Sequence, residues 1–140
     1  MEKLHVELGK NSYDIMIGEN FFEEFPKYIG EVYSGKKLFV ITDSNVHKIY
    51  EEKYKEMFKG FNYSIFVLQA GEKHKHIGIM PSIYSAMVNE GLTRKDMVVA
   101  FGGGVVGDIA GFAAASYMRG IGFIQIPTTI VSQVDSSVGG

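Results

Sequence analysis

The stretch of sequence that decides the fold is FGGGVVGD, residues 101–108. It ends a continuous apolar run that begins at Met97, and such runs are typical of strands buried on both faces of a parallel sheet. The nearly uncharged segment 105–117 follows and is expected to form a helix. The pattern G-x-G-x-x-G, which begins at Gly102, therefore lies between a strand and a helix, the context required of a phosphate-binding turn.

Two interpretations of this turn stay open from the residues alone. Glycines would let the backbone approach a pyrophosphate, and the N–H groups and dipole of the following helix favour its negative charge. The alternative is a tight strand-to-helix turn that binds nothing. A standard dinucleotide fingerprint has an acidic residue about 20 positions further on, whereas residues 123–129 contain none. Ribose hydroxyls would then have to meet Asp43 or Glu72, although Asp43 is also well suited to cap the next helix.

Strands and helices alternate on both sides of the glycine turn. Further strands are expected at 37–41, 63–68 and 123–126, and further helices at 46–58, 79–90 and from about 129 onwards. The helix at 46–58 is expected to bury one side that includes Ile49. Short connections between these elements predict an α/β fold with a Rossmann-like open, mainly parallel sheet and helices on both faces. Ligands bind outside the carboxyl ends of such strands.

The first thirty residues have a different pattern. Residues 4–8 alternate apolar and polar side chains, as in a half-buried strand, and 13–17 predict a second strand after turn-forming residues at 9–12. We therefore expect an N-terminal β-hairpin. A short helix or turn is expected at 21–28, interrupted by Pro26.

Composition excludes several classes of protein. The chain has 140 residues, 46% hydrophobic and 21% charged, which are values of a globular domain. A net charge of -2 lacks the basic footprint of a nucleic-acid or anionic-membrane binder. Without cysteine there is no disulfide and no thiolate metal site. Because no secretory signal and no apolar run of about 18 residues are present, we expect a cytoplasmic protein that binds neither nucleic acid nor membranes.

The four histidines do not predict a metal site. His74 and His76 lie among lysines, which oppose a cation, and zinc needs three or four converging ligands. A solvated loop is the simpler interpretation of this segment. His5 and His47 stand isolated in the sequence, so we expect no metal ligand in this chain.

Two charged residues flank the helix that follows the glycine turn. Asp108 is expected in its first turn, where a carboxylate would repel phosphates and should instead face a neutral or cationic group. Arg119 is expected at its end, where it either complements the helix dipole or clamps a phosphate or carboxylate.

Several motifs together resemble the N-terminal part of the 3-dehydroquinate synthase family. They are GGGVVGD at 102–108, SYMRG at 116–120, PTT at 127–129, QVDSSVGG at 133–140, and GEKHK at 71–75 with Asp43. The likeness spans nearly the whole chain. It implies an NAD-binding N-terminal domain, residues 1–140, of an enzyme of the shikimate pathway. Members convert 3-deoxy-D-arabino-heptulosonate 7-phosphate, a small sugar phosphate, to 3-dehydroquinate and phosphate, using NAD and a divalent metal, zinc or cobalt.

The resemblance also implies roles for individual residues. The adenosine side of NAD would be held by Asp43, Ser44, Asn45, Glu72 and Lys75. The pyrophosphate would meet Gly103, Gly104 and Val105, the nicotinamide side would face Asp108, and NAD would also touch Thr128 and Thr129. The substrate would be reached by the catalytic candidates Arg119 and Asp135.

The chain departs from the family where it stops, at Gly140. Family members continue with a lysine and a mostly helical second domain that supplies the metal ligands, and that domain is absent from this chain. We therefore expect a fragment that is inactive alone, and a homodimer at full length. Two alternatives are an NAD-dependent polyol or glycerol dehydrogenase-like domain and a non-catalytic nucleotide-binding module.

Overall fold

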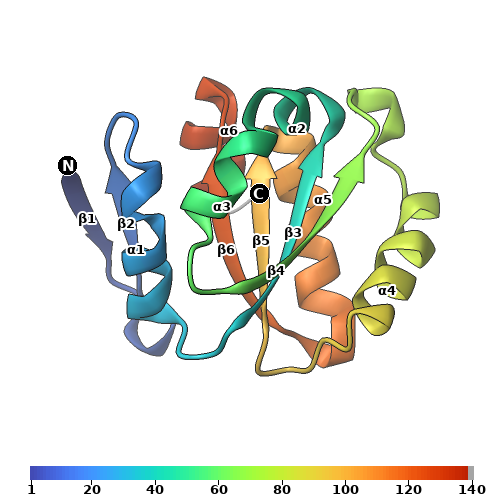
Figure 1. Ribbon diagram of the computed structural model, residues 1–140, viewed down its shortest axis with the longest axis horizontal. Helices are drawn as coiled ribbons and strands as arrows, with labels where there is room; N and C mark the ends of the chain where they lie inside the picture. Colours follow the sequence, from blue (N-terminus) through green and yellow to red (C-terminus); the bar gives the residue numbers. More distant parts are fainter. Residues whose placement is uncertain (139–140) are drawn as a thin grey trace.

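The computed structural model describes residues 1–138. Gly139 and Gly140, which belong to one of the motifs quoted above, lie outside the described residues. The centre of the fold is a parallel four-stranded sheet with the order β4-β3-β5-β6. Its strands are β3 (Lys37–Asp43), β4 (Asn62–Leu68), β5 (Met97–Gly102) and β6 (Gly122–Pro127). The predicted α/β class with an open parallel sheet is confirmed (Figure 1).

Helices cover both faces of this sheet, as expected (Figure 1). One face packs against α1 (Phe25–Val32), α2 (Ser44–Tyr50) and α3 (Tyr54–Met57). The other packs against α4 (Met80–Asn89) and α5 (Gly104–Ser116), and α6 (Ile130–Val134) follows β6. Single 3-10 turns lie at Gly9–Asn11, Phe22–Glu24, Glu51–Lys53, Glu72–His74, Ile77–Ile79, Tyr117–Arg119 and Ser136–Val138.

The alternation of side chains along the central strands builds two cores. On β3, Phe39 and Ile41 belong to the cluster under α4 and α5, whereas Leu38 and Val40 belong to the cluster under α1 and α3. Every residue of β5 is buried. A strand covered on both faces has no polar side, which is why its sequence is a continuous apolar run.

The N-terminal hairpin is present, but it is not half-buried. Strands β1 (Glu2–Val6) and β2 (Tyr13–Ile17) pair antiparallel as a separate two-stranded sheet. Leu4 is 55% exposed, and only Val6 of β1 is partly buried. The expected half-burial is wrong because the hairpin lies beyond α1 and not over the main sheet (Figure 1).

Two expected helices differ from those observed. Pro26 does not interrupt a helix; it lies in the first turn of α1, where its missing N–H costs nothing. The single helix expected at 46–58 is broken at Tyr50, whose ψ of 2° leaves the helical region. Ile49 is 69% exposed, so its expected burial is also wrong. Apolar spacing could not reveal the break, since the buried side chains beyond it keep a helical period.

Within residues 1–138, no helix combines the length and the apolar character that crossing a bilayer requires.

Candidate functional site

The ends of all four parallel strands meet at one edge of the sheet. Asp43 on β3 pairs with Leu68 on β4, and Gly102 on β5 pairs with Pro127 on β6. Strand β3 lies between β4 and β5 in the sheet. The chain continues from β3 to β4 on one side of β3, and later returns to form β5 on its other side. The helices that follow β3 and β5 therefore run over opposite faces, and the crevice between them is the position where open α/β sheets bind ligands.

The glycine turn leaves the start of α5 open at this crevice. The first backbone bond of the helix runs from the Gly107 N–H to the Gly103 carbonyl at 3.0 Å. The N–H groups of Gly104, Val105 and Val106 precede it and have no intrahelical acceptor. No side chain caps this end, because the N-cap residue is Gly103. Uncapped N–H groups at the positive end of a helix dipole favour an anion.

The first two glycines of the motif, Gly102 and Gly104, differ in what they do. A Cβ on Gly102 would lie 2.6 Å from Cγ2 of Val106, so this glycine is required by the tight turn itself. A Cβ on Gly104 would meet nothing closer than the Ser136 hydroxyl oxygen, at 3.6 Å. The fold therefore gives no reason for glycine at 104, whereas a ligand lying on the backbone gives one. The tight-turn interpretation therefore explains Gly102, whereas the pyrophosphate interpretation stays a prediction at Gly104.

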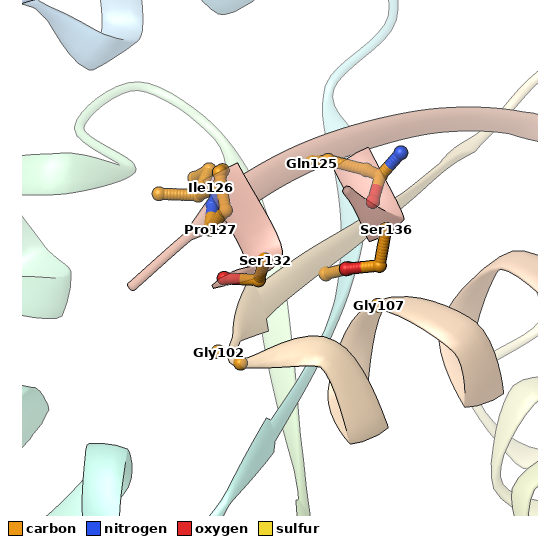
Figure 2. A pocket seen from close by; sticks show the side chains of 9 residues that line it. Gly102, Gly107, Gln125, Ile126, Pro127, Ser132 and Ser136 are labelled. Carbon is orange, nitrogen blue, oxygen red and sulfur yellow. The ribbon is translucent and has the colours of Figure 1, made fainter. Parts of the chain in front are cut away.

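A narrow crevice lies over the turn, with no room inside it for a water molecule (Figure 2). Its lining residues are Ala100, Gly102, Gly103, Gly107, Gln125, Ile126, Pro127, Ser132 and Ser136. Pockets that enclose whole ligands measure about 300–1,000 Å³. No whole ligand fits inside the crevice, so a dinucleotide would have to lie over its mouth and along the open edge of the sheet.

Two of the side chains predicted to hold the adenosine side of NAD fix the loop after β3 in place. One carboxylate oxygen of Asp43 accepts hydrogen bonds from the N–H groups of Asn45 and Val46, at 2.8 and 2.9 Å. Asp43 is thus the N-cap of α2, as its alternative role predicted. The Ser44 hydroxyl accepts the N–H of Ala70 at 3.1 Å and joins this loop to the one after β4. The Asn45 side chain is exposed at the same edge.

Lys75 and Asp108 form an ion pair between the loop after β4 and α5. The Lys75 ammonium lies 2.6 Å from Asp108 Oδ2 and 3.8 Å from Glu72 Oε1. The hydrogen bond to Asp108 raises the pKa of Lys75. Asp108 lies in the second turn of α5, not in the first as expected, because the helix begins at Gly104. The pair brings together two residues that the resemblance assigns to opposite ends of NAD.

The turn after β6 completes the edge. The Thr128 N–H donates to the Gly102 carbonyl at 2.9 Å, which fixes this turn to the glycine turn. The Thr129 hydroxyl accepts the N–H of Ser132, and the buried Ser132 hydroxyl accepts the N–H of Thr129, at 3.2 and 3.1 Å. This capping box starts α6. Sequence reasoning missed Ser132, although serine three residues after threonine was the available signal.

The two catalytic candidates are far apart. Asp135 follows α6 at the carboxyl edge, where it is exposed. Arg119 lies beyond the other end of α5, whose 13 residues span about 20 Å. The expectation that Arg119 ends the helix is wrong. It is the last residue of the 3-10 turn that follows α5, with a left-handed φ of 67°. The structure therefore does not bring Arg119 and Asp135 to one site within this chain.

Among the described residues, no three histidine, aspartate or glutamate side chains gather as metal ligands. His5 is not isolated: its ring nitrogens lie 2.7 Å from Asp14 and 3.2 Å from Glu7. His47 is not isolated either, since its Nδ1 lies 3.1 Å from the Tyr54 hydroxyl.

Comparison with known proteins identifies the family. The family described as 3-dehydroquinate synthase N-terminal matches residues 65–140, more than half of the chain. The chain belongs to the 3-dehydroquinate synthase family. It is 50% identical to a protein named 3-dehydroquinate synthase from Clostridium acetobutylicum, over its whole length and 40% of that relative. The chain thus spans about two fifths of that member of the family.

Solved structures of related enzymes share the fold. A 2-deoxy-scyllo-inosose synthase complexed with carbaglucose-6-phosphate, NAD+ and Co2+ matches 96% of this chain and 37% of its own, with a TM-score of 0.86 and 27% identity. A 2-epi-5-epi-valiolone synthase from Streptomyces hygroscopicus subsp. jinggangensis, with NAD+ and Zn2+ bound, matches 94% and 36%, with a TM-score of 0.78 and 27% identity. The folds of these two solved structures agree with membership of the 3-dehydroquinate synthase family.

Proposed function

We propose that residues 1–140 form the NAD-binding N-terminal domain of a 3-dehydroquinate synthase. The whole enzyme would convert 3-deoxy-D-arabino-heptulosonate 7-phosphate to 3-dehydroquinate and phosphate. The observation that carries the proposal is the uncapped start of α5 at the switch point between β3 and β5. Family membership favours this function over a polyol dehydrogenase. The biosynthetic chemistry of the named relatives supports a cytoplasmic location.

The residues at the carboxyl edge fit a dinucleotide. We assign the pyrophosphate to the backbone of Gly103, Gly104 and Val105, because the N–H groups of Gly104 and Val105 have no intrahelical acceptor and the two glycines have no Cβ. The same edge carries the other proposed NAD-binding residues: Asp43, Ser44, Asn45, Glu72, Lys75, Asp108, Thr128 and Thr129. When bound, NAD would supply the transient oxidation of a substrate alcohol. The chain's own part is to bind and orient the cofactor.

The Asp43 carboxylate can serve two partners at once. Its Oδ1 accepts both cap hydrogen bonds, which leaves Oδ2 for a ribose hydroxyl. The residues described here do not fit the divalent metal that the two related structures contain, since they gather no ligand set. We therefore assign zinc or cobalt to the remaining part of the full-length enzyme and derive no step from it.

The positions of Arg119 and Asp135 support a role for the expected homodimer. Asp135 is placed to reach a sugar phosphate bound at the carboxyl edge of its own chain, whereas Arg119 lies at the opposite edge. Arg119 can contact such a substrate only from another copy. In full-length enzyme, an equal mixture of Arg119→Ala and Asp135→Ala subunits should regain up to about a quarter of the activity, because half the dimers hold one intact site of two. No regained activity would exclude this arrangement.

Binding of NAD to the 140-residue chain tests the proposal. Wild type should bind NAD weakly in calorimetry, and Gly104→Val should abolish binding, because its methyl groups cover the open N–H groups. Gly30→Val is the matched control, since a Cβ there meets nothing within 4 Å and lies on α1, away from the site. Unchanged NAD affinity in a folded Gly104→Val variant would exclude the glycine turn as the binding site. Synthase activity of the chain alone would overturn its predicted inactivity.

A further inference from the structure

One hydroxyl group near the glycine turn has no hydrogen-bond partner. The hydroxyl oxygen of Ser136 is buried, yet no donor or acceptor of the described chain reaches it. Its neighbours are satisfied: the Ser137 hydroxyl donates to the Gln133 carbonyl at 2.9 Å, and the Ser132 hydroxyl donates to the Thr129 carbonyl at 2.8 Å. A buried hydroxyl without a partner loses its hydration and gains nothing in return. Such a group in a folded protein calls for an explanation.

The Ser136 hydroxyl lies beside the open end of α5. It is 3.6 Å from the Cβ position of Gly104 and 3.7 Å from that of Gly107. Figure 2 shows it between Gln125 and the first turns of the helix. Gln125 makes no hydrogen bond to it, and its amide nitrogen donates to the Ser137 carbonyl at 3.2 Å. The hydroxyl therefore stands next to the same N–H groups that lack an acceptor.

We propose that Ser136 is a ligand of the diphosphate, donating its hydroxyl hydrogen to a phosphate oxygen that also accepts N–H groups at the start of α5. The inference rests on the proposed function and adds a residue to it. A phosphate oxygen can accept from both kinds of donor, and its negative charge strengthens each bond. Ser136 reaches this position because the capped helix α6 and the 3-10 turn Ser136–Val138 fold back over the glycine turn.

A ligand role and a merely structural role predict different effects of substitution. If Ser136 serves the ligand, Ser136→Ala removes an unpaired buried hydroxyl from the ligand-free protein and a hydrogen bond from the complex. We expect an unchanged or higher Tm without ligand, together with roughly tenfold weaker binding of NAD. Ser137→Ala is the matched control: it loses a satisfied hydrogen bond, so we expect a lower Tm and NAD affinity within about twofold of wild type.

The experiment is calorimetry of wild type and both variants with NAD and with inorganic pyrophosphate. Weaker binding of either probe by Ser136→Ala, but not by Ser137→Ala, supports the inference. A wild type that binds pyrophosphate but not NAD would contradict the proposed function. The affinity of Ser136→Ala for pyrophosphate would then decide whether Ser136 is a ligand of the anion. Equal affinity of wild type and Ser136→Ala for every probe that binds overturns the inference, as does a wild type that binds neither.

Discussion

The Lys75 ammonium and the Asp108 carboxylate lie 2.6 Å apart, although 33 residues separate them. The pair joins the loop after β4 to the second turn of α5. Both residues belong to the proposed NAD site, so the pair fixes two parts of that site relative to each other. The Lys75 and Asp108 side chains are 37% and 34% exposed, so solvent weakens the attraction between them.

Breaking this ion pair should affect binding more than stability. We expect Lys75→Ala to lower the free energy of unfolding by less than about 1 kcal/mol, because the pair is largely solvated. NAD affinity should fall, and its dependence on salt should weaken, because a cation is lost beside the negatively charged cofactor. Urea unfolding and calorimetry measure the two effects. Lys73→Ala, two residues away and exposed, is the control; an equal loss of affinity there would assign the effect to net charge alone.

Gly102 and Val106 should be energetically coupled. Gly102→Ala would place a Cβ 2.6 Å from Cγ2 of the buried Val106, and overpacking of this kind costs about 1–3 kcal/mol. Val106→Gly removes all three atoms that the new Cβ would meet, including the Val106 Cβ at 2.7 Å, so the double variant should be less destabilised than the sum of the two single variants, by about 0.5–3 kcal/mol. Denaturant unfolding of all four proteins completes the cycle. Strict additivity would contradict a steric role for Gly102.

The two roles of Asp43 can be separated by two substitutions. Asp43→Ala removes the N-cap of α2 and should cost about 0.5–2 kcal/mol of stability. Asp43→Asn keeps a capping oxygen, so its stability should stay close to that of wild type. If the free oxygen of Asp43 accepts a ribose hydroxyl as a carboxylate, Asp43→Asn should weaken NAD binding alone. Equal NAD affinity of Asp43→Asn and wild type would leave Asp43 a cap only.

The sequence determines much of this fold through local pattern. The apolar run into Gly102 predicts a strand buried on both faces, and β5 is buried throughout. The order of strands and helices also predicts at which edge of the sheet Arg119 lies. A helix that follows a parallel strand returns the chain to the opposite edge, so Arg119 had to lie away from Asp135. Because topology separates the two residues within one chain, a shared role at one substrate would require a second copy.

Other features of the site depend on tertiary packing and leave no local pattern. The pairing of Lys75 with Asp108 is set by how the loop after β4 folds over α5. The unpartnered hydroxyl of Ser136 follows from the return of the chain over the glycine turn, whereas Ser137 beside it is satisfied. Two adjacent serines are alike in the sequence, and only the structure distinguishes them.

Acidity should control the order of the N-terminal hairpin. The hydrogen bond to Asp14, followed by that to Glu7, raises the pKa of His5, so protonated His5 stabilises the hairpin below its unfolded pKa of about 6.5. That contribution is lost as pH rises through the higher folded value. Lys3, and then His5, lower the pKa of Asp14. The contribution of Asp14 to stability is therefore present above about pH 4 and lost on further acidification.

Hydrogen exchange measures this pH dependence. Amide hydrogens of β1 and β2 should be best protected from exchange, after correction for intrinsic rates, between about pH 4 and 6.5. His5→Ala should remove the loss of protection at higher pH. An NMR titration that places the pKa of His5 at or below 6.5 would contradict this account, since neither carboxylate would then be holding the ring in its charged form.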